Sequence, residues 1–150
     1  MTVARVLSTL FAMLSLSAVA QPPVQLDPFT QATAGMPTCP VVEPRLYSPD
    51  QMRTEAHARA ERGTRCALEG TCEPGGAYKR DGEINEQVRA EIAADKRFAD
   101  TSVWVTTSRK WVTLKGCVRT KAQKRALATL ARHQANVERV FDELNVRRSR

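Results

Sequence analysis

The side chains of this chain that are best suited to catalysis, metal binding or disulfide formation belong to two histidines and four cysteines. They are His57, His133, Cys39, Cys66, Cys72 and Cys117. Neither histidine has a nucleophile or a carboxylate at a recognisable catalytic spacing, and the sequence contains no G-x-S-x-G or H-E-x-x-H motif. We therefore expect surface roles for both histidines, and we expect no catalytic residue, no metal, no cofactor and no enzymatic activity.

The cysteines favour disulfide bonds over a metal site. Cys66 and Cys72 are further apart than the spacing of about two to four residues that is usual for zinc ligands. An even number of cysteines in an exported chain suggests two disulfides, but four cysteines allow three pairings and the sequence does not choose among them. We favour Cys66 with Cys72 and Cys39 with Cys117, because the second bridge closes a longer loop and restricts the unfolded chain more.

The first residues of the chain predict export. Arg5 is followed by the apolar run VLSTLFAMLSLSAVA, whose last residues, Ala18, Val19 and Ala20, fit the A-x-A cleavage pattern of secretory signal peptides. The run has roughly 15 residues, fewer than the roughly 20 of a membrane-spanning helix, so an uncleaved anchor is the less favoured alternative. We assign residues 1–20 to a signal peptide cleaved near Ala20, and we expect the mature protein in the periplasm or at the outer membrane.

An arm, a short helix and a loop are expected next. The arm, residues 21–47, is rich in proline and aperiodic, which predicts extended backbone rather than a helix. Residues 48–80 are assigned to a short helix and a cysteine-containing loop. Ser48 and Pro49 are favourable as the cap and first residue of this helix, which we expect to stop at Gly63. The glycine, proline and cysteine content after Gly63 argues against regular structure.

Between residues 81 and 146, the pattern indicates a compact α-β-β-α-β unit. Asp81 can cap its first helix, in which one apolar stripe repeats every four residues: Ile84, Val88 and Ile92. Thr120 and Gln123 form a capping box at the start of the second helix.

The three expected strands have two different faces. One face, in TSVWVTTSRKWVTLKGCV and VERVFDELNV, carries valine and leucine side chains that can share a core with both helices. This predicts an α+β fold, a three-stranded mixed sheet with two helices on one face. Asp142 falls on the same inward face, which the pattern does not explain. The other face carries large aromatic side chains and a cysteine: Trp104, Trp111, Phe141 and Cys117. Because an open aromatic face needs a cover, we expect the arm to lie over it, fastened by a disulfide.

This unit resembles the BON domain, named for bacterial osmotically inducible and nodulation proteins. The resemblance rests on the helix DGEINEQVRAEI, the hairpin VWVTTSRKWVTLKGCV and the ending VERVFDELNV. Its most specific part is the pattern V-x-L-x-G-x-V, formed by Val112, Leu114, Gly116 and Val118. Family members usually have glycine in the hairpin turn and before the last strand, where this chain has Lys110 and Asn136. Asparagine tolerates positive φ, whereas Lys110 leaves the turn type open. The resemblance implies a non-enzymatic binding module of the bacterial envelope, here in one copy where members often have two.

The basic residues favour an anionic partner. The formal net charge is +7, and residues 147–150 form a basic tail. The residues that we predict for lipid or partner binding are Lys121, Lys124, Arg125, Arg132, Arg147, Arg148, Trp104, Trp111 and Phe141. The attraction of a basic residue to an anionic leaflet is worth about 1 kcal/mol when the residue is near the surface. A solvated helix face is the simpler interpretation of the same charges. The expected export argues against nucleic acid as the partner.

We therefore predict an exported BON protein that binds anionic phospholipid surfaces and supports envelope integrity. The alternative is a protein-interaction subunit or adaptor of a periplasmic, outer-membrane or secretion complex. The oligomeric state is not predicted.

Overall fold

The computed structural model describes residues 22–147, so the expected signal peptide and Arg148 lie outside the described residues. In chain order the elements are β1 (Val24–Gln25), β2 (Phe29–Ala34), β3 (Leu46–Tyr47), α1 (Pro49–Leu68), α2 (Asp81–Ala94), the 3₁₀ helix η1 (Lys96–Phe98), β4 (Ser102–Ser108), β5 (Trp111–Val118), α3 (Lys121–Arg132) and β6 (Arg139–Val146).

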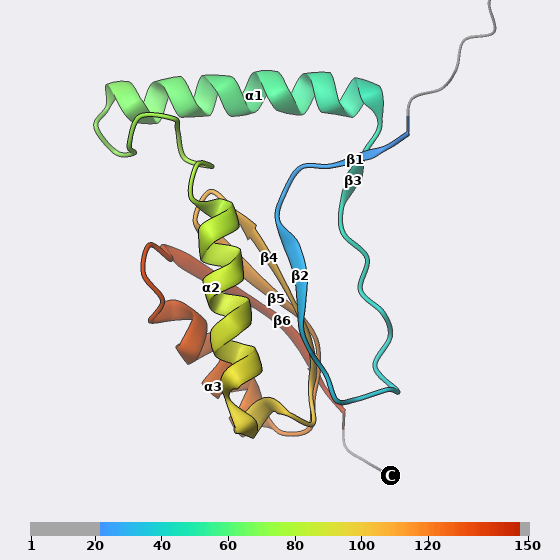
Figure 1. Cartoon of the computed structure of the whole chain (residues 1–150). Coiled ribbons are helices and arrows are strands. Elements are labelled where there is room, and N and C mark those ends of the chain that lie inside the picture. The colour runs from blue at the N-terminus through green and yellow to red at the C-terminus, as the bar shows by residue number, and fades with distance from the viewer. Residues whose placement is uncertain (1–21, 148–150) are drawn as a thin grey trace, which may run out of the picture.

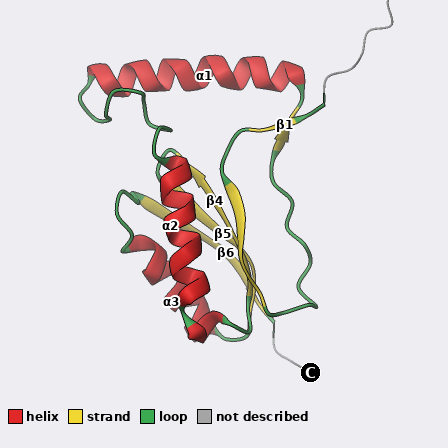
Figure 2. Cartoon of the chain, in the orientation of Figure 1, coloured by secondary structure: helices red, strands yellow, loops and turns green. Residues whose placement is uncertain are grey.

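A four-stranded mixed sheet forms the centre of the molecule, in the order β2-β4-β5-β6. β4 pairs antiparallel with both β2 and β5, and β5 pairs parallel with β6. α2 and α3 lie on one face of this sheet, as Figure 1 and Figure 2 show. The predicted α+β fold is confirmed, and the predicted order of elements is present as α2-β4-β5-α3-β6.

The sheet has one strand more than the three that we predicted. The additional strand, β2, comes from the arm and pairs with β4 from Phe29, opposite Thr106, to Ala34, opposite Ser102. The sequence of β2, FTQATA, has too little apolar alternation to indicate a strand. Its partner strand also lies far along the chain, so no local signal could predict the pairing.

The core between the helices and the sheet contains the predicted apolar stripe of α2 and the predicted valine and leucine face of the strands. Its buried members are Ile84, Val88, Ile92, Phe98, Val103, Val105, Val112, Leu114, Val118, Leu127, Ala131 and Leu144. The predicted capping box of Thr120 and Gln123 is present at the start of α3. At Gly116 φ is +118°, and a Cβ would lie 2.1 Å from the carbonyl oxygen of Ser102, which explains the glycine of the V-x-L-x-G-x-V pattern.

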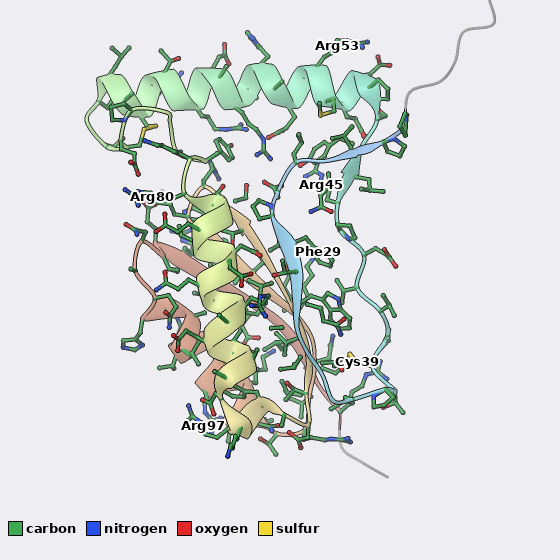
Figure 3. The ribbon with its side chains drawn as sticks, viewed as in Figure 1. Phe29, Cys39, Arg45, Arg53, Arg80 and Arg97 are labelled. Atoms are coloured by element: carbon green, nitrogen blue, oxygen red, sulfur yellow. A yellow bond between two sulfur atoms is a disulfide. The ribbon has the colours of Figure 1, made fainter. Side chains whose placement is uncertain are left out.

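The arm covers part of the other face of the sheet. Met36 and Cys39 pack with Trp104 and Cys117 in a second buried cluster, which leaves Trp104 only 6% exposed. A disulfide joins Cys39 to Cys117. Figure 3 shows Cys39 in the part of the arm that lies far from α1. The arm then returns alongside the sheet, and β3 pairs with β1. The predicted cover is therefore present over Trp104, whereas Trp111 and Phe141 lie outside this cluster.

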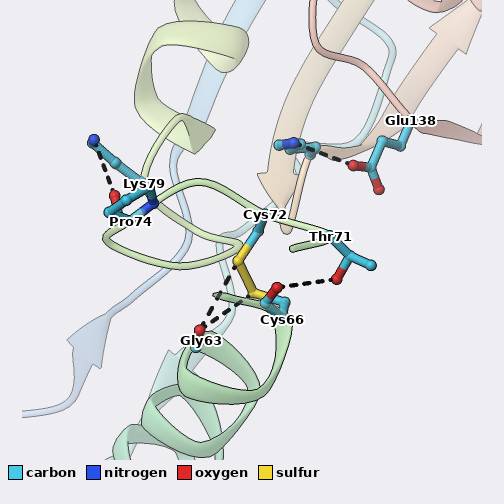
Figure 4. Close-up of a disulfide and its surroundings, with 8 residues drawn as sticks. Gly63, Cys66, Thr71, Cys72, Pro74, Lys79 and Glu138 are labelled. Carbon is cyan, nitrogen blue, oxygen red and sulfur yellow. Dashed lines mark hydrogen bonds and ion pairs between the residues drawn. A yellow bond between two sulfur atoms is a disulfide. The ribbon is translucent and has the colours of Figure 1, made fainter. Parts of the chain in front are cut away.

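α1 is longer than predicted and runs through Gly63 to Leu68. Gly63 does not end the helix; the following loop approaches it at Gly76, where φ is +85° and a Cβ would lie 3.0 Å from the Cα of Gly63. The disulfide between Cys66 and Cys72 closes the turn after α1, as Figure 4 shows. Both favoured disulfide pairings are therefore confirmed.

Candidate functional site

α3 presents a row of basic side chains to solvent. Lys121, Arg125 and Arg132 are exposed and lie on the side of the helix away from the buried Leu127 and Ala131. The sequence of α3 contains no acidic residue, and among residues 22–147 none of the three basic side chains forms an ion pair. These three residues, the α3 basic row, therefore offer positive charge that nothing in the described fold neutralises.

Lys124 is used inside the fold instead. Its Nζ lies 3.4 Å from Asp142 Oδ1 and donates to the carbonyl oxygen of Leu144 at 2.5 Å. Asp142 Oδ1 also accepts the N–H of Leu144 at 3.1 Å. Leu144 lies on β6, an edge strand. The two side chains therefore hydrogen-bond both its N–H and its carbonyl oxygen, which would otherwise be unpaired at the open edge. This explains the inward Asp142, and it holds Lys124 against the sheet rather than free for a partner.

Four other side chains gather on the opposite face of the sheet, near the β4–β5 turn. The Cζ of Arg109 lies 4.1 Å from the ring centroid of Trp111, and the Cζ of Arg139 lies 5.0 Å from it. The rings of Trp111 and Phe141 meet edge to face with their centroids 5.8 Å apart, and Phe141 is 38% exposed. We call these four residues the arginine–tryptophan surface. The sequence indicated the aromatic residues but not the arginines, since Arg139 meets Trp111 only through the register of β5 and β6.

Asp81 holds the turn that carries Arg109. Its carboxylate accepts the N–H groups of Arg109 and Lys110, both at 2.8 Å. These residues have φ values of 54° and 61°. A type I′ hairpin turn requires such positive φ values, which glycine usually supplies, but neither residue of this turn is glycine. Burial raises the pKa of Asp81, and the two backbone N–H groups offset part of that rise. The prediction that Asp81 caps α2 was wrong, because Arg80 occupies the cap position and the Asp81 carboxylate is used by the hairpin.

The family of this α-β-β-α-β unit follows from comparison with known protein families. A family model described as the BON domain matches residues 80–148. Residues 80–148 are a BON domain. The domain is present in one copy, and no curated protein matches the chain. BON domains are generally non-enzymatic and are known to bind membranes and phospholipids.

A buried asparagine ties the BON domain to the arm. Asn85 Nδ2 lies within hydrogen-bond distance of the carbonyl oxygens of Pro28 and Val105, at 3.2 and 3.1 Å, and its Oδ1 accepts the Thr30 hydroxyl at 2.7 Å. Pro28 and Thr30 belong to the arm, whereas Val105 lies on β4. Asn85 therefore joins α2, the arm and the sheet at one point. Sequence reasoning missed it because it lies beside the apolar stripe of α2 and matches no motif.

The predicted binding residues do not form one site. The α3 basic row lies on the helix-covered side of the BON domain, whereas Trp111 and Phe141 lie on the opposite face of the sheet. Trp104 is buried beneath the arm and cannot meet a partner without movement of the arm. Arg147 is exposed, and its N–H donates to the Val118 carbonyl oxygen at 2.8 Å, which extends the pairing of β6.

α1 is attached to the rest of the molecule through a small polar network. Arg59 pairs with Asp27 of the arm at 2.7 Å, and the Cζ of Arg59 lies 4.4 Å from the ring centroid of Tyr78. Burial lowers the pKa of Arg59, but the hydrogen bond and charge of Asp27 raise it, and the net change is upward. Arg62 donates to the Tyr78 hydroxyl at 2.7 Å. α1 itself has no buried residue, so this network and the disulfide are its main anchors.

Residues 22–147 contain neither a metal-binding cluster nor a membrane-spanning helix. In that range no cluster of three or more histidine, cysteine, aspartate or glutamate side chains is arranged to hold a metal ion. None of the helices between residues 22 and 147 has the length and apolar character needed to cross a membrane. His57 and His133 are both exposed, with His57 3.2 Å from Glu61 and His133 bonded to the Thr129 carbonyl oxygen.

Proposed function

We propose that this is an exported, non-enzymatic BON-domain protein of the bacterial envelope that binds anionic phospholipid surfaces and supports envelope integrity. The observation that carries the proposal is a set of basic side chains on the BON domain without ion-pair partners among residues 22–147. They are Lys121, Arg125 and Arg132 on α3, and Arg109 and Arg139 near the hairpin turn.

The two disulfides support the exported location. Disulfides persist in oxidising compartments such as the periplasm and are rare in the cytosol. One of them, Cys39–Cys117, fastens the arm to the BON domain, so the fold around Trp104 depends on an oxidising environment. We therefore propose the periplasm or the periplasmic side of the outer membrane as the location.

Sedimentation with vesicles tests the lipid function. The processed protein, purified from the periplasm of a producing bacterium, is expected to sediment with vesicles that contain phosphatidylglycerol and not with pure phosphatidylcholine. Because salt screens exposed charges, binding should weaken as ionic strength rises from about 0.05 to about 0.3 M. Equal sedimentation with both kinds of vesicle, or none with either at low salt, would contradict the proposal.

One observation favours a second candidate function, a protein-interaction subunit of an envelope or secretion complex. The 20-residue helix α1 has no buried residue, although helices in folded proteins usually gain stability by burying an apolar face. Photo-crosslinking from Ala60, an exposed residue of α1, tests this function in the native envelope. A single salt-resistant adduct would support it, and the absence of any adduct would exclude α1 as the contact.

A further inference from the structure

The arginine–tryptophan surface is pre-assembled in the described fold. Trp111 and Arg139 are directly opposite each other on β5 and β6, and Asp81 fixes the turn that carries Arg109. Both guanidinium groups lie within 5.0 Å of the Trp111 ring centroid. A guanidinium that lies over an aromatic ring keeps the N–H donors on its edge free for an anion. The surface can therefore bind an anionic group without first ordering two flexible side chains.

Near the β4–β5 turn, the charge on this face that the fold of residues 22–147 leaves unpaired belongs to the arginine–tryptophan surface. The neighbouring lysines are paired, Lys110 with Glu138 at 3.3 Å and Lys115 with Glu143 at 3.4 Å. Within residues 22–147, neither Arg109 nor Arg139 forms an ion pair. The end of the sheet near the turn therefore carries two positive charges beside an exposed phenylalanine ring.

We propose that the arginine–tryptophan surface, and not the α3 basic row, is where the BON domain docks on an anionic bilayer. This inference rests on the lipid-binding function proposed above and names the surface that performs it. Arginine binds phosphate oxygens through two parallel N–H donors, and tryptophan is favoured at the head-group level of membranes. Phe141 adds apolar area next to Trp111. One side of the sheet therefore offers groups for both parts of a bilayer: arginines for the phosphates, and aromatic rings for the boundary of the acyl region.

The α3 basic row offers charge alone. The exposed side of α3 carries Lys121, Arg125 and Arg132 among alanine and threonine, without an aromatic residue. It also lies on the other side of the sheet, because the buried side of α3 packs against the core on the helix-covered face. A flat bilayer can therefore contact one of the two surfaces at a time.

Two variants with the same change in charge distinguish these surfaces. Arg109→Gln with Arg139→Gln removes two charges from the arginine–tryptophan surface, and Lys121→Gln with Arg125→Gln removes two from α3. Vesicles of phosphatidylethanolamine and phosphatidylglycerol, mixed at about three to one, are the probe, at about 0.15 M salt where exposed charges act over only about 8 Å. We expect about thirtyfold weaker binding for the first variant, at about fivefold per basic residue, and less than about threefold for the second.

Tryptophan fluorescence gives an independent measurement. The chain has two tryptophans, and Trp104 is covered by the arm, so brominated phospholipids should quench Trp111 alone. In the Trp111→Phe variant the remaining emission should not be quenched. Thermal unfolding of each variant shows whether its fold is kept.

The outcomes separate the two proposals. If the native protein does not bind anionic vesicles, the lipid function itself fails. If it binds but the α3 variant loses as much affinity as the first variant or more, or Trp111 is not quenched, the docking surface is overturned while the lipid function stands. In that case the arginine–tryptophan surface would be a candidate for an acidic protein partner.

Discussion

The arm and α1 are adjacent in the chain, and both lie outside the BON domain, yet they are integrated to very different degrees. The arm contributes β2 to the sheet and buries Met36 and Cys39 against Trp104. α1 has a capping box at Ser48 and twenty helical residues, but none of them is buried. Each segment contains one cysteine of a disulfide, but Cys66 of α1 bridges to the following loop, whereas Cys39 of the arm bridges to a strand of the sheet, 78 positions along the chain. Regular local sequence therefore does not indicate which segment the fold depends on.

The two disulfides differ in the same way in their expected contributions to the free energy of unfolding. Cys39–Cys117 has a sequence separation of 78 and Cys66–Cys72 one of 6. In the chain-entropy description, the loss of conformational entropy in the unfolded chain grows with the length of the closed loop. That description gives about 4.5 kcal/mol for the first bridge and about 2 kcal/mol for the second. The arm is thus the segment whose attachment should determine global stability.

The largest expected effect is loss of the long-range bridge. Cys39→Ser with Cys117→Ser should lower the free energy of unfolding by about 4 kcal/mol, because the unfolded chain gains the freedom of a long loop. Denaturant unfolding followed by tryptophan emission measures this change. A red shift of the native emission is also expected, since Trp104 loses its cover when the arm detaches. A loss below about 1 kcal/mol would show that β2 pairing alone holds the arm.

Removal of Asn85 should have the next largest effect. Asn85→Ala leaves buried polar groups of the arm and of β4 without a partner, which costs about 2–3 kcal/mol. Gln87→Ala is the matched control on α2, because Gln87 makes one partly buried hydrogen bond to Gln134, and its loss should cost less than about 0.5 kcal/mol. Equal losses for the two variants would show that the connection through Asn85 adds nothing to the attachment of the arm.

The sequence predicted the parts of this fold that depend on local periodicity. The stripe of Ile84, Val88 and Ile92 gave α2, and the alternation around Trp111 gave the hairpin, because each signal lies within one element. The placement of Cys117 on the same sheet face as the tryptophans also led to the favoured disulfide pairing, which the structure has.

The features that sequence reasoning missed depend on contacts between distant elements. β2 has no pattern of its own and becomes a strand only because the edge of β4 is available to it. Arg139 acquires its position beside Trp111 from the register of two strands, and Asp81 acquires its partners from a turn 28 residues later. The candidate site depends on the last two, so the sequence indicated its aromatic residues but not the arginines between which Trp111 lies.

The third change leaves the arm and α1 in place and weakens the BON domain itself. Asp81→Ala removes two charge-assisted hydrogen bonds to the β4–β5 turn, which should lower the free energy of unfolding by about 2 kcal/mol. Glu83→Ala is the control, since Glu83 on the same helix pairs only with Arg80 at the surface and should cost less than about 0.5 kcal/mol. If Asp81→Ala is as mild as the control, the turn does not need its carboxylate.

The pH dependence of the same carboxylate has a definite sign. Burial raises the pKa of Asp81 in the folded protein, so the folded state takes up its proton at a higher pH than the unfolded state does. Its linkage contribution to stability is therefore fully present below the unfolded pKa and is lost as pH rises through the folded pKa. The stability of the native protein relative to Asp81→Asn should increase as pH falls from neutral toward about 4. Denaturant unfolding at several pH values measures this difference, and the opposite trend would mean that the turn N–H groups outweigh burial.

The smallest effect on the sheet is expected from the bridge at the end of α1. Cys66→Ser with Cys72→Ser releases a short loop beside a helix that has no buried residue. Because α1 can open without exposing the core, its loss of order should be local and should lower the unfolding free energy seen by tryptophan emission by less than about 1 kcal/mol.

Hydrogen exchange of the backbone amides separates local from global opening in this variant. Amides in the last turns of α1 should exchange faster once the bridge is removed, whereas those of β2 should keep their native rates because β2 is held by pairing with β4 and by Cys39. The Cys39→Ser and Cys117→Ser variant should show the reverse pattern. If loss of the Cys66–Cys72 bridge also speeds exchange in β2, then α1 and the arm open together, and the contact between Arg59 and Asp27 couples them more strongly than its single ion pair suggests.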